Sequence, residues 1–98
     1  MTKAFSTHVN KSLDHDGFHM TFANNVTVSV MFGKRNYCDS GETTAEVAIW
    51  DADDNWYILN EDNNHMSLTK VHSGSDVIGH CNSNLVAFIM DLAKKLVI

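Results

Sequence analysis

Four oxygen-bearing side chains have the spacing of a calcium-binding loop. Asp51, Asp53 and Asn55 alternate, and Asp62 follows eleven residues after Asp51, which matches the EF-hand ligand positions 1, 3, 5 and 12. Trp56 stands where that loop needs Gly for its sharp bend, and strand-like segments rather than helices flank it. The pattern therefore favours an acidic turn between two Trp-bearing strands.

Histidine and cysteine could supply zinc or hydrolytic chemistry. The chain has two cysteines, Cys38 and Cys81, and six histidines: His8, His15, His19, His65, His72 and His80. No CxxC pair occurs, and no close spacing requires these residues to converge, so we expect no catalytic residue, no metal site and no cofactor. Cys81 would be activated if it lay at a helix N-terminus. A small zinc-binding or hydrolytic domain is the alternative function.

The segment Lys34, Arg35, Asn36 and Tyr37 is the strongest candidate for binding, and the alternative is a solvated loop with Tyr37 packed on the sheet. It concentrates two cations, an amide and an aromatic ring in one loop of an acidic chain. Arg and Tyr anchor interfaces, and binding residues are often found on loops that rigid strands position. Trp50 and Trp56 join this set, because they would form an apolar patch with Met31 if no helix covers their face of the sheet.

A β-hairpin between Phe18 and Phe32 must position that loop. Apolar residues alternate with other residues on both sides of Asn24-Asn25, as in half-buried strands. A three-residue loop, 23–25, would pair Phe22 with Val26 and bring all the apolar residues to one face, with Asn25 in the left-handed conformation. A two-residue loop would put the two apolar sets on opposite faces, so we predict the three-residue loop.

Further periodic segments complete an α+β fold. Strands are expected at 43–50 and 56–59, with a turn at 51–55 between them, and the polar stretch 60–75 has room for an edge strand near 66–71. Apolar residues at helical spacing predict one C-terminal amphipathic helix over about 83–97, capped by Asn82 or Ser83. The expected architecture is an antiparallel β-meander of about four strands packed against this helix.

Length and charge limit the function classes. Ninety-eight residues fit one domain, 1–98, in which residues 1–16 form either a loose N-terminal arm or a short helix. Seven basic residues against twelve acidic ones give a net charge of −5, which argues against general nucleic-acid binding. No apolar run is long enough to span a membrane, and no secretory signal is evident, so we expect a cytoplasmic protein with free cysteines.

Three segments carry a resemblance to a known group of proteins. They are FHMTFANNVTVSVMFGKRNYCDSG, AEVAIWDADDNWY and DVIGHCNSNLVAFIMDLAKKL, within residues 17–96. The chain resembles small accessory proteins of bacteriophages and prophages, a family without an established activity. The resemblance implies a non-enzymatic binding protein that blocks a host protein or sequesters a small ligand. We further expect a homo-oligomer, such as a homodimer, that uses the 34–37 loop or the free sheet face.

Elemental analysis of the purified chain separates these two functions. A binding protein of this kind should contain no stoichiometric metal, because nothing in the spacing demands converging ligands. One equivalent of zinc per chain, surviving dialysis against a weak chelator, would contradict this expectation and favour the alternative.

Overall fold

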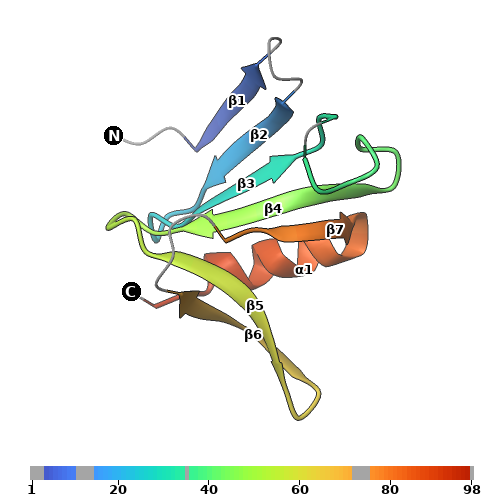
Figure 1. The fold of residues 1–98 in the computed structure, drawn as a ribbon. Helices are drawn as coiled ribbons and strands as arrows, with labels where there is room; N and C mark the ends of the chain where they lie inside the picture. Colours follow the sequence, from blue (N-terminus) through green and yellow to red (C-terminus); the bar gives the residue numbers. More distant parts are fainter. Residues whose placement is uncertain (1–3, 11–14, 35, 72–75, 98) are drawn as a thin grey trace.

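A single antiparallel sheet dominates the fold. The computed structural model describes residues 4–10, 15–34, 36–71 and 76–97, and these form seven strands and one helix (Figure 1). The elements are β1 (Phe5–Asn10), β2 (His15–Thr21), β3 (Thr27–Met31), β4 (Thr44–Trp50), β5 (Trp56–Asp62), β6 (His65–Val71), β7 (Ile78–Asn82) and α1 (Ser83–Lys94). The sheet order is β1-β2-β3-β4-β5-β6, and β7 pairs with β4. The α+β class is confirmed, but the expected four strands are too few.

The first hairpin has the predicted register. Phe18 pairs with Val30 and Met20 with Val28. The Phe22 N–H donates to the Val26 carbonyl at 2.9 Å, which closes a three-residue loop. Asn25 has a φ of 65°, so it occupies the left-handed region that this bulged loop requires. The buried face therefore decided the register, as expected.

The β4–β5 turn repeats the same loop geometry. The Asp51 N–H donates to the Asn55 carbonyl at 2.9 Å, and the Asp54 N–H donates to the Asp51 carbonyl at 3.1 Å. Asp54 has a φ of 61° and takes the position that Asn25 has in the first hairpin. Asp, like Asn, tolerates this conformation because its short polar side chain can bond locally.

Three strands differ from the expected architecture. Residues 5–10 form β1, so they are neither a helix nor a loose arm, and they pair along their length with β2. β5 continues to Asp62 and forms a hairpin with β6, which lies where the edge strand was expected. β7 was not predicted, because its sequence IGHCN has no alternation of apolar residues. The remaining part of 1–16 lies largely outside the described residues.

Strand β4 is shared by three neighbours. β3 pairs along one edge, from Glu46 to Trp50. On the other edge, β7 pairs with the segment from Thr44 to Val47, whereas β5 pairs only with Ile49 and Trp50. Because two strands divide one edge, the β5–β6 hairpin diverges from the body of the sheet (Figure 1).

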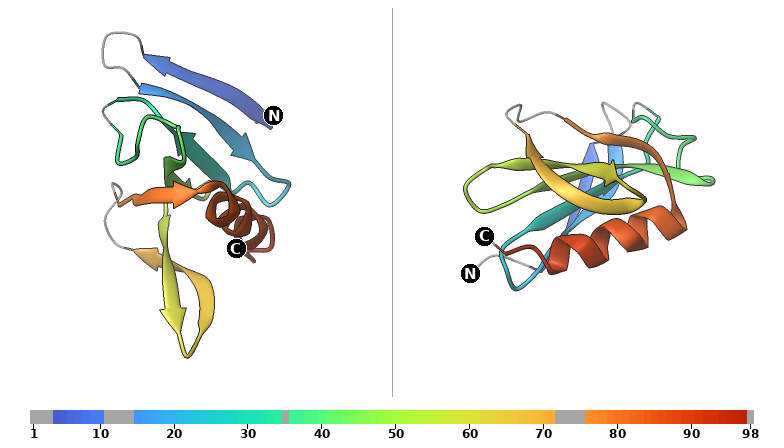
Figure 2. Two further views of the ribbon diagram at one scale, coloured as in Figure 1. Left: turned by 90° about the vertical axis from the view of Figure 1, so that its right-hand side faces the viewer. Right: turned by 90° about the horizontal axis from the view of Figure 1, so that it is seen from below.

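Helix α1 forms the second layer. It lies on one side of the sheet (Figure 2), where Ile89 and Ala93 are fully buried against the valines of β3 and β4. Asn82 caps its start, as its side-chain oxygen accepts the Leu85 N–H at 2.8 Å. At the other end, the Asn24 side chain donates to the Ala93 carbonyl at 2.8 Å and so ties the helix to the first hairpin. Among the described residues, no helix is long and apolar enough to cross a bilayer.

Substitutions at Asn25 test the hairpin register. Asn25→Val should lower the free energy of unfolding by about 1–2 kcal/mol, because a β-branched residue is disfavoured in the left-handed region. Asn25→Gly should change it by only a few tenths of a kcal/mol. Urea denaturation followed by circular dichroism measures both variants, and equal losses for Val and Gly would contradict the assigned loop.

Candidate binding surface

The sheet face opposite α1, here called the helix-free face, is the main candidate surface. The side chains of Val28, Val30, Val47 and Ile49 belong to the core beneath α1. Side chains alternate along a strand, so the intervening residues point to the other side. The helix-free face therefore carries His19, Thr27, Ser29, Met31, Glu46, Ala48, Trp50 and Trp56.

Three aromatic rings lie together on this face. Trp50 and Trp56 are paired across β4 and β5, and their rings stack with centroids 5.1 Å apart and an interplanar angle of 30°. The His19 ring meets Trp50 edge-on, at 5.2 Å and 85°. All three are half-buried, so each keeps part of its ring surface accessible. Stacked and edge-on arrangements are those that aromatic quadrupoles favour.

Small side chains surround these rings. Ser29 and Ala48 are paired across β3 and β4, and both are buried although they lie on the face opposite α1. The Thr21 and Thr27 hydroxyls are hydrogen-bonded at 2.8 Å. The rings are therefore the bulky side chains in this part of the face, among short neighbours.

The 33–41 loop lies on the same side of the sheet as these rings, opposite α1 (Figure 2). Its conformation depends on Asn36, whose side-chain oxygen accepts the Gly33 N–H at 3.0 Å. Glu46 holds the loop from β4, accepting from the Asn36 amide at 3.3 Å and from the Tyr37 N–H at 2.8 Å. Asn36 therefore has a structural role in this loop, whereas sequence reasoning assigned it to binding.

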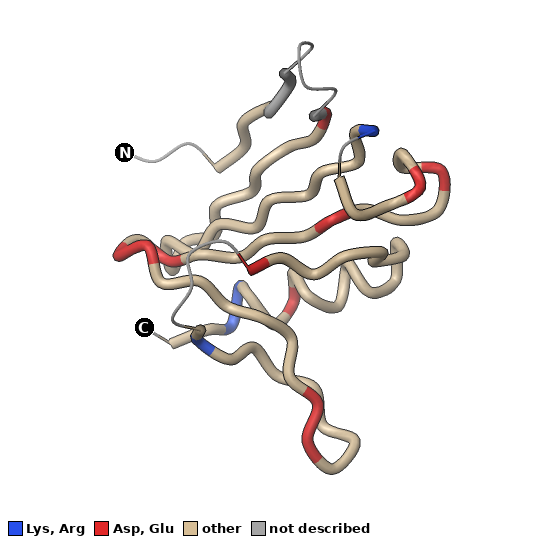
Figure 3. Tube along the Cα trace, in the orientation of Figure 1, with Lys and Arg blue, Asp and Glu red and all other residues tan. Residues whose placement is uncertain are grey.

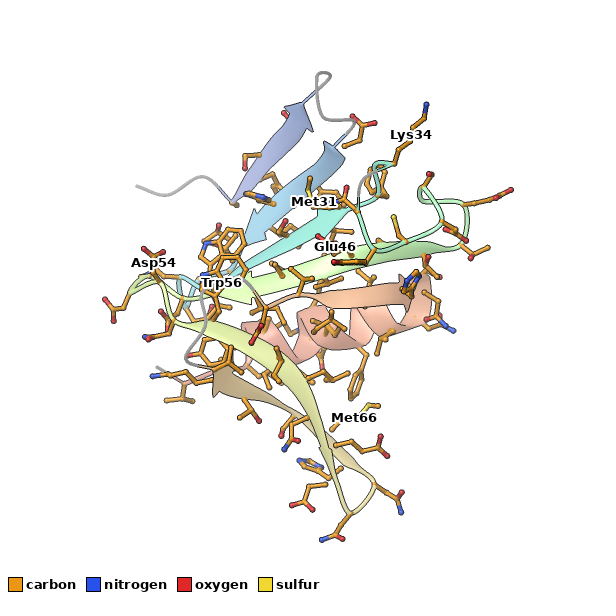
Figure 4. All side chains as sticks on the ribbon, in the orientation of Figure 1. Met31, Lys34, Glu46, Asp54, Trp56 and Met66 are labelled. Atoms are coloured by element: carbon orange, nitrogen blue, oxygen red, sulfur yellow. The ribbon has the colours of Figure 1, made fainter. Side chains whose placement is uncertain are left out.

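The other members of the predicted binding loop are placed differently. The Tyr37 side chain is 66 % exposed, while its carbonyl accepts the His80 N–H at 2.8 Å. A Cβ on Gly79 would approach the Tyr37 Cβ to 2.9 Å, so Gly79 allows β7 to pass close to the loop. Lys34 is exposed and extends beyond the sheet, well apart from Trp56 (Figure 4). Arg35 lies outside the described residues.

Most charges of the described residues lie around this surface, and Glu46 is the exception within it. In the described residues, acidic positions gather in the loops and turns at the ends of the strands (Figure 3). Glu46 is the one charged residue in β3 and β4, and its carboxylate accepts hydrogen bonds from amides of the loop. The centre of the face is therefore apolar and aromatic, with an acidic periphery.

The calcium-like spacing has a structural explanation. Asp51 is 2 % exposed, and its carboxylate accepts from the backbone of Asp53 and Asn55 and from the Tyr57 hydroxyl at 2.8 Å. Asp62 lies at the far end of β5, roughly 20 Å along the strand from the turn. The four oxygen-bearing residues therefore do not converge, and the Asp51 carboxylate accepts hydrogen bonds within its own turn.

The ionisation of this buried pair follows from its contacts. Burial acts to raise the pKa of Asp51, but the hydrogen bonds from Asn55, Tyr57 and Asp53 outweigh it and lower that pKa below its usual value. Burial, together with the hydrogen bond to Asp51, raises the pKa of Tyr57 to about 12. Asp51 is therefore a carboxylate and Tyr57 a phenol at neutral pH.

Neither thiol has the surroundings of a nucleophile. Cys81 is buried in the core, and this burial raises the pKa of its thiol to about 11. Cys38 is half-buried, and its Sγ lies 3.7 Å from the Gly33 carbonyl that it bonds. Both cysteines are free. Among the residues whose side chains are described, no three of His, Cys, Asp and Glu gather as a metal site, and that set omits the side chains of His8, His15 and His72.

A shallow groove lies on the opposite side, beside α1. It has a volume of about 840 Å³, and its apolar lining includes Phe18, Met20, Val30, Phe32, Val86 and Met90. Sequence reasoning did not locate this groove. The helix contacts β3, β4, β6 and β7, so Phe18 and Met20 of β2 lie beside it.

Comparison with protein-family models, curated proteins and solved structures gives no significant match to this chain. The placement of its residues therefore has to carry the functional argument.

Acid titration of stability tests the Asp51 network. A carboxylate whose pKa is lowered by folding stabilises the protein above its unfolded pKa, near 3.8, and this stabilisation is lost as pH falls through the folded value. Asp51→Asn should therefore cost about 1.5–3 kcal/mol of unfolding free energy at pH 7, and the difference from wild type should shrink below pH 4.

Tyr57→Phe is the matched variant for this measurement. It removes one hydrogen bond to a buried charge and keeps the carboxylate, so it should cost about 1.5–3 kcal/mol at pH 7. Urea denaturation at pH 7 and pH 3 gives both numbers. An Asp51→Asn penalty that is unchanged at pH 3 would refute the ionisation assigned to Asp51.

Proposed function

We propose that this chain is a non-enzymatic binding protein that holds a partner protein against its helix-free face. The single observation that carries the proposal is the Trp50–Trp56 stack, with His19 edge-on, on a sheet surface that the one described helix leaves uncovered. Trp is the residue most enriched at the energetic centres of protein interfaces. Three partly exposed rings would supply such a centre.

The shape of the surface favours a macromolecular partner over a small ligand. Small molecules bind in concave sites that bury most of their surface. The groove of the described residues lies beside α1, on the other side of the sheet. The helix-free face presents a stacked Trp pair, and the exposed Tyr37 at its loop adds a second aromatic contact. A partner protein could contact both the Trp pair and Tyr37.

The charge of the chain indicates the character of this partner. The net charge is −5, and the acidic positions surround an apolar centre. Complementary potentials accelerate encounter and select partners. The partner should therefore present apolar side chains ringed by Lys and Arg. The proposal also adopts two predictions, an accessory phage protein and a cytoplasmic location in the host cell. Metal analysis tests the alternative function, a zinc-binding or hydrolytic domain.

Affinity capture with matched variants tests this function. Tagged wild type should capture a specific protein from a bacterial lysate, and Trp56→Ala should weaken its binding roughly thirtyfold, equivalent to about 2 kcal/mol for an interface anchor. Phe88→Ala is the control, since Phe88 is 41 % exposed on α1 and leaves the helix-free face intact. The captured protein, once identified, is then titrated by calorimetry.

Folding is checked separately, because the Trp pair also supports the β4–β5 hairpin. Trp56→Phe keeps a ring on the sheet, and it should give intermediate binding with a near-native melting temperature. Equal capture by wild type, Trp56→Ala and Phe88→Ala would overturn the assignment of this face.

A further inference from the structure

Three strands of the described sheet, β1, β6 and β7, pair with one neighbour each, and their free edges are protected to different degrees. The pairing of β7 with β4 is irregular. An edge strand exposes unpaired N–H and C=O groups, and proteins usually guard it with a charge, a proline or a bulge. β6 carries the exposed Lys70. β1 reads FSTHVN and contains no charged residue and no proline, and its pairing with β2 is unbroken. The β1 edge therefore lacks all three guards.

The ladder with β2 determines which groups of β1 point outward. The Thr21 N–H donates to the Ala4 carbonyl at 2.8 Å, and bonding alternates along an antiparallel pair. Ala4 and Ser6 therefore bond to β2, and the backbone groups of Phe5, Thr7 and Val9 point away from the sheet. Phe5 is 68 % exposed, the largest exposure of any Phe, Tyr or Trp among the described residues.

We infer that β1 is the dimerisation strand, and that it pairs antiparallel with β1 of a second copy. Under two-fold symmetry, Thr7 lies opposite Thr7 of the second copy, and the backbone of Phe5 lies opposite that of Val9. The outward N–H and C=O groups of the two strands then face one another. Three such pairs form about six hydrogen bonds, two for each pair. Thr opposite Thr is among the favourable cross-strand pairs.

An uncharged edge suits a second copy as the occupant. Two chains of net charge −5 repel each other, and a contact without acidic side chains adds least to this repulsion. β1 supplies an edge without charge along its whole length, and its groups are complementary to themselves under a two-fold axis. The acidic loops and turns lie elsewhere (Figure 3). The pairing would also bring the exposed Phe5 to the contact.

This surface is separate from the helix-free face, so the inference goes beyond the proposed function. The two-fold axis is perpendicular to the joined sheet, so both copies of α1 lie on the same side of it. Both helix-free faces then point the same way. The dimer can be tested without the partner, and its failure would leave the Trp56 experiment unaffected.

Light scattering over a concentration series is the first test. The mass should rise with concentration from the 11.0 kDa monomer toward twice that value. Thr7→Pro removes an outward N–H without removing a bond to β2, so it should raise the dissociation constant at least tenfold. Thr7→Val keeps this N–H and should dimerise like wild type. A wild-type monomer at all concentrations, or a Thr7→Pro dimer of unchanged affinity, would overturn the inference.

Hydrogen exchange of single amides is the second test. The Thr7 amide should be protected at high concentration and exchange freely on dilution, while the Ser6 amide, already bonded to β2, should change little. This contrast distinguishes edge pairing from a dimer formed through another face. Protection of Thr7 that appears only with a captured foreign protein would assign the edge to that protein and refute self-pairing.

Discussion

The backbone of β4 carries three hydrogen-bonded ladders and is the constraint on which the fold depends. β3 occupies one edge, and β7 and β5 divide the other between its two halves. Val47 and Ile49 are fully buried, and α1 packs on this strand as well. The same strand presents Trp50 and Glu46 on its opposite face, where one forms the aromatic stack and the other holds the 33–41 loop. The core and the candidate binding surface are thus two sides of one strand.

Short-range patterns were enough to predict the local structure. The alternation around Asn24-Asn25 fixed the hairpin register, because only one loop length brings both apolar sets to the buried face. The spacing of apolar residues likewise located α1, and Asn82 is its cap. Trp50 and Trp56 could be grouped because they flank a predicted turn, and turns bring flanking residues into opposition. These features depend on neighbours in sequence.

Features that depend on distant partners could not be predicted. β7 follows from pairing with β4 and from the left-handed His80, neither of which leaves a periodic signal. The spacing of four in Phe5, Val9 and Leu13 looks helical, but pairing with β2 decides for a strand. In the binding loop, residue types suggested one functional unit, whereas Glu46 engages Asn36 and leaves Tyr37 exposed. Composition indicates which residues can bind, and tertiary contacts decide which are free to do so.

The divergence of the β5–β6 hairpin gives the molecule an uneven architecture. β5 pairs with β4 at only two positions, while its outer half pairs with β6 alone and ends in the left-handed Asn63 and Asn64. The residues at this tip are exposed. Added sequence there would lengthen a free ribbon without disturbing the core or the ladders of β4. The tip is therefore a natural grafting point, where a fluorophore or peptide epitope could be installed while both faces of the sheet stay intact.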